Sequence, residues 1–279
     1  MLLSRSFRNG FVQNCPKWRF AGYLFDQASF YIFIFRLFRF YFFLIGKKIF
    51  KDWKLGLLGS LFLILTPRIF SASFYNPKDI PFLCSYVLGI YTLLLFLEKK
   101  KWWTTILHGL AVGIACSIWT PGLILIPITF FFYLLDLFLK MQLDWKNIKK
   151  LIFLSVLFIP IILLVIYISS PIIYTHPIET YIKVFNIFKN YPHQGYQLFM
   201  GKDIGNIIPW NYSIVWFAIS SPILYSFLFL IGVAAIIRIT LTRSKIRVSL
   251  LNNIPIYIAG ACGILPILIV ILVDVTFFL

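Results

Sequence analysis

Long apolar runs recur along this chain of 279 residues, and short polar turns separate them. A helix needs roughly 20 apolar residues to cross the hydrocarbon core of a bilayer, which is about 30 Å thick. The composition agrees, since 61% of the residues are hydrophobic and only 13% are charged. Only helices and closed barrels satisfy the backbone in lipid, and the alternating pattern of a barrel is absent from the sequence. The sequence therefore predicts an all-α fold, a polytopic transmembrane helical bundle.

About eight spans are expected. Residues 24–279 are predicted to form this single bundle, with an atypical basic segment at 1–23 before it. Two polar stretches could hold a site, an external loop at 67–81 and a longer one at 170–213. The predicted spans are 24–46, 55–66, 82–97, 104–119, 121–138, 151–169, 214–237 and 254–279.

The basic residues explain the net charge of +17, because they gather at alternate ends of the spans. Fifteen lie in turns on one side, and five lie in turns on the other side after the first span. The positive-inside rule then places the lysine-rich turns in the cytoplasm and the loops at 67–81 and 170–213 outside. Trp119 and Trp216 mark the outer interface. We expect a multi-pass protein of a plasma membrane with its site facing outward, and no nucleic-acid partner.

The loop at 67–81 carries Asp79, one of only nine acidic residues. An ionised carboxylate beside a bilayer is costly unless it is paired, hydrated or bound to a metal, so it is a hint of function. The alternative is structural, because Asp79 precedes Pro81 and an apolar run, where an acid stabilises the start of a helix. Arg68 and Lys78 could neutralise it. The residues alone leave both interpretations open.

The loop at 170–213 holds His193, Gln194 and Trp210 among glycines, prolines and aromatic residues. Defined turns with Tyr and Trp side chains would suit stacking against a sugar or a polyprenyl chain. An aromatic belt at the membrane surface would have the same composition. In the fourth span, His108 lies beside Gly109 and is predicted to pack or to make hydrogen bonds between helices.

No phosphate loop of the Walker type, H-E-x-x-H or G-x-S-x-G motif occurs in the sequence. Other residues, however, resemble a known family. DWKLGLL at 52–58 is followed by TPRIF at 66–70 and FYNPKDIPF at 74–82. These stretches are similar to the early region of multispanning membrane glycosyltransferases of the C superfamily (GT-C), of the protein-mannosyltransferase type in family 39. The run from Tyr191 to Tyr212 also fits, and the resemblance covers about residues 40–235.

The resemblance implies transfer of a sugar from a polyprenyl-phosphate-linked donor to a protein or glycolipid acceptor on the outer face of the membrane. It implies that Asp79 is catalytic, near a divalent metal ion such as Mg or Mn or near the donor phosphate. A metal or a basic side chain would stabilise the departing phosphate. The candidates for substrate and donor-phosphate binding are Arg68, Lys78, Tyr75, Asn76, His193, Gln194 and Trp210.

The sequence departs from the family where a first external loop with an acidic pair is expected, and Asp26 alone does not replace that pair. The chain also ends inside the apolar run 273–279. The two ends of the sequence therefore predict a truncated member of the family. Without the first external loop and its acidic pair, transferase activity of this chain is in question. Two other classes stay open, a non-catalytic membrane scaffold and a transporter that flips lipid-linked sugars. Arg36 and Arg39 in the first span are a slight hint of the transporter class, and the alternative is that they are external or snorkelling residues near an altered terminus.

Overall fold

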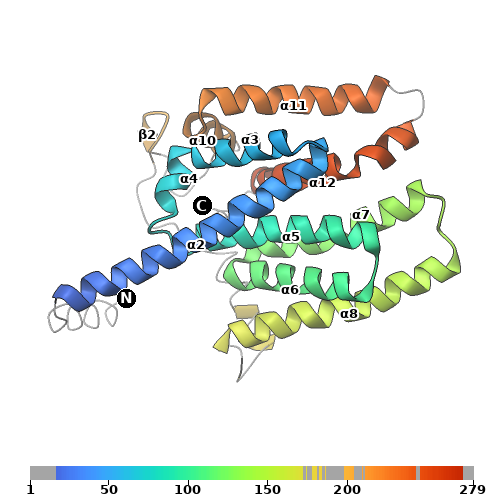
Figure 1. Cartoon of the computed structure of the whole chain (residues 1–279), viewed down its shortest axis with the longest axis horizontal. Coiled ribbons are helices and arrows are strands. Elements are labelled where there is room, and N and C mark those ends of the chain that lie inside the picture. Colours follow the sequence, from blue (N-terminus) through green and yellow to red (C-terminus); the bar gives the residue numbers. More distant parts are fainter. Residues whose placement is uncertain are drawn as a thin grey trace.

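The structure is a computed structural model that describes residues 17–171, 174, 178–180, 182–183, 186, 198–203, 209, 211–242 and 246–272. Nearly all of these residues are helical, so the prediction of an all-α bundle is confirmed (Figure 1). One short antiparallel hairpin, β1 (Leu198–Phe199) and β2 (Lys202–Asp203), is present. The helices are α2 (Lys17–Phe50), α3 (Trp53–Ile64), α4 (Pro67–Ala72), α5 (Asp79–Lys99), α6 (Trp102–Ile118), the 3-10 helix η1 (Thr120–Ile124), α7 (Leu125–Leu139), α8 (Trp145–Ser169), α10 (Tyr212–Ser220), α11 (Ile223–Thr242) and α12 (Ile246–Leu272).

Four helical stretches within the described residues are long and apolar enough to cross a membrane. They are Ser29–Phe50, Asp79–Lys99, Thr120–Leu139 and Trp145–Ser169. Shorter apolar helices lie at Trp53–Ile64, Trp102–Ile118, Ile223–Arg238 and Asn253–Pro266. The protein is therefore a multi-pass membrane protein, and the number of eight spans stays a prediction.

Two predicted boundaries are wrong. The span expected at 214–237 is broken into α10 and α11, because Ser221 is extended and Pro222 follows it. A proline disfavours helical conformation in the residue before it and has no N–H to donate. The loop expected at 67–81 is partly helical, since α4 occupies its first six residues and α5 already begins at Asp79. Residues 1–16 and 273–279, on which the expected truncation depends, lie outside the described residues.

The lysine-rich turns gather at one end of the bundle. The α2–α3, α5–α6 and α7–α8 connections lie toward the right of Figure 1, whereas α4 and the start of α5 lie toward the left. Local chemistry sets these turns: Asp52 caps α3 by accepting a hydrogen bond from the Lys54 N–H at 2.8 Å. Lys100 ends α5 in the left-handed conformation with φ 46°. The alternation predicted from the charges is thus present in the fold.

Glycines let two pairs of helices approach closely. A Cβ on Gly46 of α2 would lie 2.9 Å from the Cα of Gly56 in α3. On α6, a Cβ on Gly109 or Gly113 would meet side chains of α8, at 3.0 Å from Ile161 and 2.7 Å from Val165. Small residues spaced in this way are typical of helix packing in membranes. They fix α3 against α2 and α6 against α8.

A buried polar cluster joins the helices at the centre of the bundle. His108 of α6 is fully buried, and its Nδ1 and Nε2 each lie 2.9 Å from a threonine hydroxyl, Thr92 of α5 and Thr129 of α7. Its ring stacks between Phe96 and Phe158 at 5.9 and 5.1 Å between centroids. The prediction that His108 packs and bonds between helices is confirmed.

Candidate functional site

Asp79 is the first residue of α5, at the end of the bundle opposite the lysine-rich turns, and it is exposed. The side-chain amide of Asn76 donates a hydrogen bond to Asp79 Oδ2 at 2.8 Å. The Asn76 side-chain oxygen accepts from the backbone N–H groups of Lys78 and Asp79 at 3.0 and 2.8 Å. This is the local turn that Asn favours. The carboxylate is thus held in one place yet remains accessible from outside the protein.

Lys78 lies directly before Asp79 but does not pair with it. Its Nζ lies 4.2 Å from the centroid of the Trp119 ring, where the ring attracts a cation. Trp119 ends α6, and its ring meets Phe82 of α5 edge-on at 5.2 Å. Within the described part of the chain, no ion pair involves Asp79 or Lys78. The site therefore presents a carboxylate and an ammonium group side by side in the sequence, neither of them neutralised by an ion pair.

Arg68 belongs to a different group of side chains. Its guanidinium carbon lies 5.9 Å from the centroid of the Trp216 ring in α10. Trp216 contacts Tyr212 at 6.2 Å, and Tyr212 contacts Phe199 of the hairpin at 5.1 Å. An aromatic row thus links α4 to the hairpin. The described side chains give Arg68 no ion pair with Asp79, so the expected neutralisation is not observed.

The remaining candidates divide in two. Tyr75 is 69% exposed and lies in the turn before Asn76, where a ligand could reach it. His193, Gln194 and Trp210 lie outside the described residues, so their roles stay predictions. The contact of Lys78 with Trp119 is not among the predictions from sequence, which place only Trp119 at the same interface. That placement was the only available signal, because the two residues are far apart in the chain.

The metal prediction for Asp79 depends on how many ligands the site offers. The described residues contain no group of three or more His, Cys, Asp or Glu side chains that could hold a metal ion. Asp79 Oδ2 accepts a hydrogen bond from Asn76, and no described group donates to Oδ1. Mg²⁺ is often held by one or two carboxylates together with phosphate oxygens and water. The site fits this open kind of Mg²⁺ site and does not form a complete cage of protein ligands.

An apolar groove of about 740 Å³ lies among α7, α11 and α12. The 3-10 helix η1 joins Trp119, the residue beneath the Lys78 ammonium, to Ile124 at the edge of this groove. No charged residue lines it. Its lining includes Ile124, Ile128, Phe132, Ile236, Tyr257 and Leu265. One edge of the groove thus lies at the end of η1, five residues along the chain from Trp119.

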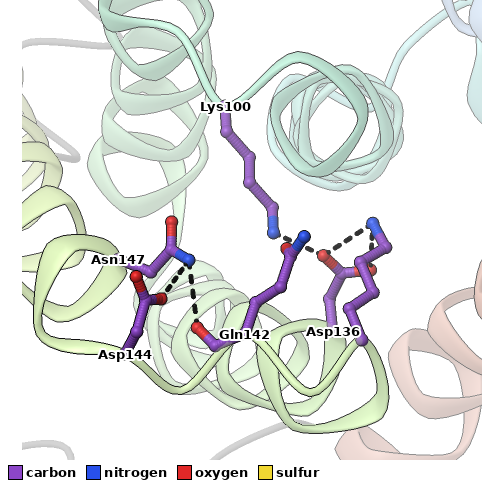
Figure 2. A network of polar contacts seen from close by, with 6 residues as sticks. Lys100, Asp136, Gln142, Asp144 and Asn147 are labelled. Atoms are coloured by element: carbon purple, nitrogen blue, oxygen red, sulfur yellow. Dashed lines mark hydrogen bonds and ion pairs between the residues drawn. The ribbon is translucent and has the colours of Figure 1, made fainter.

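The opposite end of the bundle carries a buried ionic cluster that we did not predict. Figure 2 shows Lys100 reaching Asp136, whose carboxylate also pairs with Lys140 at 2.8 Å. The Asp136 side chain is 4% exposed, and the Lys100 ammonium lies 4.9 Å from the Tyr133 ring. The cluster ties the α5–α6 turn to α7, and we assign it to stability.

Several apolar helices long enough to cross a bilayer define a multi-pass membrane protein. One end of its bundle carries the exposed Asp79 carboxylate and Lys78 ammonium group. Residues 21–173, more than half of the chain, match the dolichyl-phosphate-mannose-protein mannosyltransferase family. The chain belongs to this family, and it is a membrane glycosyltransferase of the mannosyltransferase type. The matched region includes Arg68, Lys78 and Asp79. No curated protein and no solved structure is significantly similar to the chain.

Proposed function

We propose that this protein transfers a sugar from a polyprenyl-phosphate-linked donor to a protein or glycolipid acceptor at the membrane surface that carries Asp79. The family supports the glycosyltransferase class. The observation that carries the proposal is the Asn76–Asp79–Lys78 turn, which holds an exposed carboxylate and an ammonium group at the start of α5, at the end of the bundle opposite the lysine-rich turns. Loops at the ends of a rigid bundle are the usual place for such chemistry.

Lys78 is proposed to receive the donor phosphate. In the transfer, the bond between the anomeric carbon and the phosphate oxygen breaks, and its electron pair stays with the phosphate. The acceptor oxygen forms the new bond to the sugar and loses its proton to a base. The ammonium group of Lys78 would stabilise the charge that grows on the phosphate. The Trp119 ring restricts where that ammonium group lies.

Asp79 could act with a divalent metal ion or without one, and removal of metal ions by a chelator distinguishes these two roles. A carboxylate and a phosphate repel each other, so Asp79 would help hold the phosphate only through a shared divalent ion. Such an ion would act as a Lewis acid at the phosphate. Without a metal, Asp79 would be the base that takes the acceptor proton. Loss of transfer in EDTA, restored by Mg²⁺ or Mn²⁺, supports the first role, and full activity in EDTA supports the second.

The groove among α7, α11 and α12 is the proposed place for the apolar chain of the donor. It is apolar throughout, and η1 leads from it to Trp119. A polyprenyl chain could therefore lie in the groove while its phosphate meets Lys78. Transfer should then require a donor with a chain long enough to enter the groove, and a short-chain analogue should raise KM more than it lowers kcat.

The test of the function is transfer of labelled mannose from polyprenyl-phosphate-linked mannose to a protein or glycolipid acceptor, in membranes that contain the full chain. Asp79→Asn should abolish transfer while insertion is unchanged. Asp52→Asn is the matched control, because asparagine also caps helices and Asp52 lies at the other end of the bundle. Transfer by Asp79→Asn at the wild-type rate would overturn the assignment. Flipping of labelled lipid without transfer by the wild-type chain would instead favour the transporter class.

We further propose that the Asp79 end faces outward from a plasma membrane, as the charge distribution predicts. The described cysteines Cys84, Cys116 and Cys262 are buried, so a new cysteine can be labelled against a low background once Cys15 is replaced by serine. An impermeant maleimide should label Tyr75→Cys in intact cells. It should label Lys101→Cys only after the membrane is opened. The reverse pattern would contradict the orientation.

A further inference from the structure

Two arginines lie inside the first membrane-spanning helix, and no described residue neutralises them. Arg36 and Arg39 belong to the stretch Ser29–Phe50 of α2. Neither takes part in an ion pair among the described side chains. Arg39 Nε is buried without a hydrogen-bond partner. Placing a charged side chain at bilayer depth costs free energy, and such side chains usually have a partner of opposite charge. We therefore expect an anion to neutralise these two arginines.

The two side chains share one side of α2. Residues three apart are neighbours on a helix surface, and helical side chains lean toward the N-terminus. Arg39 follows this rule, since its guanidinium carbon lies 5.6 Å from the centroid of the Phe35 ring, one turn closer to the N-terminus. Arg36 is exposed. The N-terminal end of this span is the end that carries Asp79 on α5, so the charges lean toward that surface.

Helix α3 stops at the level of the arginines. The Ser60 hydroxyl donates to the Arg39 carbonyl oxygen at 3.1 Å, and Gly46 lies against Gly56, so the register between α2 and α3 is fixed. Since the two helices are antiparallel, Ile64 at the end of α3 lies one turn beyond Ser60, beside the turn of α2 that contains Arg36. With 12 residues, α3 is about 18 Å long, which is shorter than the hydrocarbon core.

A hydrophobic helix shorter than the hydrocarbon core is accommodated by local thinning of the bilayer, which brings the polar surface closer to its ends. The chain turns at Thr66 and continues into α4 with Arg68 and Ser71, so the residues beyond α3 are no longer uniformly apolar. The flank of α2 next to this turn is therefore a place where a lipid headgroup can approach Arg36 without crossing the whole apolar core.

We propose that Arg36 and Arg39 bind the phosphate of an anionic membrane lipid beside the end of α3. The guanidinium fork suits phosphate oxygens, with which it forms paired charge-assisted hydrogen bonds. The phosphate belongs either to a polyprenyl phosphate or to an anionic phospholipid, and both present the same group. The site lies on α2 and does not depend on the role of Asp79.

The proposal is tested with the full chain in nanodiscs of phosphatidylcholine to which phosphatidylglycerol or polyprenyl phosphate is added. Bound lipid is counted by native mass spectrometry. The wild-type chain should retain one anionic lipid in preference to phosphatidylcholine. The double variant Arg36→Gln/Arg39→Gln should bind it with an affinity lower by a factor of about ten or more, as expected for the loss of charged hydrogen bonds. Lys54→Gln, at the lysine-rich end, is the matched control and should bind as the wild type does.

The lipid arms decide the source of the phosphate. Polyprenyl phosphate that the wild type retains and the double variant loses identifies a polyprenyl-lipid site on α2, separate from the Lys78 site, whereas phosphatidylglycerol lost in the same way identifies a phospholipid site; either supports the proposal. Equal retention by the wild type and the double variant overturns it, as does a wild type that shows no preference for anionic lipid. Because the double variant could fail to fold, a photoactivatable anionic lipid is also crosslinked to the wild-type chain. Labelling confined to peptides outside residues 29–72 would overturn the proposal independently of any variant.

Discussion

At the start of α5, Asn76 makes the capping hydrogen bonds and also holds the carboxylate of Asp79 in place. The Asn76 side-chain oxygen accepts from the backbone N–H groups of Lys78 and Asp79, while its amide donates to the Asp79 carboxylate at 2.8 Å. The hydrogen bonds of a cap are therefore made by Asn76. Asp79 contributes the acceptor for the Asn76 amide and its charge, and the effect of that charge on the helix start is small at an exposed position. The carboxylate remains available for a ligand.

Replacement of Asn76 should affect stability more than replacement of Asp79 does. Asn76→Ala removes the two hydrogen bonds to the backbone and should lower the free energy of unfolding by about 0.5–2 kcal/mol. Asp79→Asn keeps those bonds and should change stability by less than about 1 kcal/mol. Thermal unfolding in detergent measures both. A larger loss of stability in Asp79→Asn than in Asn76→Ala would show that the carboxylate is structural.

Gly56 should not tolerate a larger side chain. Its Cβ would lie 2.8 Å from the backbone nitrogen of Lys47, so Gly56→Ala must push α2 and α3 apart, at a cost of about 1–3 kcal/mol. Gly232→Ala in α11 is the control, because nothing lies within 4 Å of the new Cβ. Alanine is the better helix former, so this control should be neutral or slightly stabilising. Unfolding curves that shift equally for both variants would rule out the close contact.

His108 should stabilise the bundle mainly by filling space. His108→Ala removes a ring stacked between two phenylalanines and should cost about 2–5 kcal/mol. Thr92→Val keeps the shape but removes one hydrogen bond to the ring, which in membranes is worth about 0.6 kcal/mol. Reversible unfolding in detergent or bicelles distinguishes these values. A Thr92→Val cost as large as that of His108→Ala would mean that the hydrogen bonds dominate.

The two ion-pair sites at the lysine-rich end should differ in strength. Asp136→Asn leaves the buried ammonium of Lys100 without its partner, and it should cost about 3–5 kcal/mol. Glu98→Gln breaks the pair with Lys48, in which the Glu98 side chain is 54% exposed, and it should cost less than about 1 kcal/mol. High salt should weaken the second pair only. Similar costs for the two variants would contradict the burial of Asp136.

The sequence alone could predict the alternating arrangement because lysines and apolar runs are local features. Lys99, Lys100 and Lys101 mark a turn whichever helices pack beside it. The hydropathy pattern did not predict the helix break at Pro222, because residues 214–237 are almost uniformly apolar and hydropathy does not detect a change of helix direction. The pairing of Lys78 with Trp119 could not be foreseen, since it depends on how α5 and α6 pack. Asp79 was found as a charge in an unusual place, but its contact with Asn76 required the geometry of the turn.

The groove among α7, α11 and α12 has a kinetic consequence. If the groove holds the lipid chain of the proposed donor, that ligand would arrive through the plane of the bilayer, and its encounter rate would follow its density in the membrane and the fluidity of that membrane. Dilution of the vesicles in buffer would leave this rate unchanged, whereas dilution of the ligand with inert lipid would reduce it. The working concentration for such a site is therefore a mole fraction of lipid.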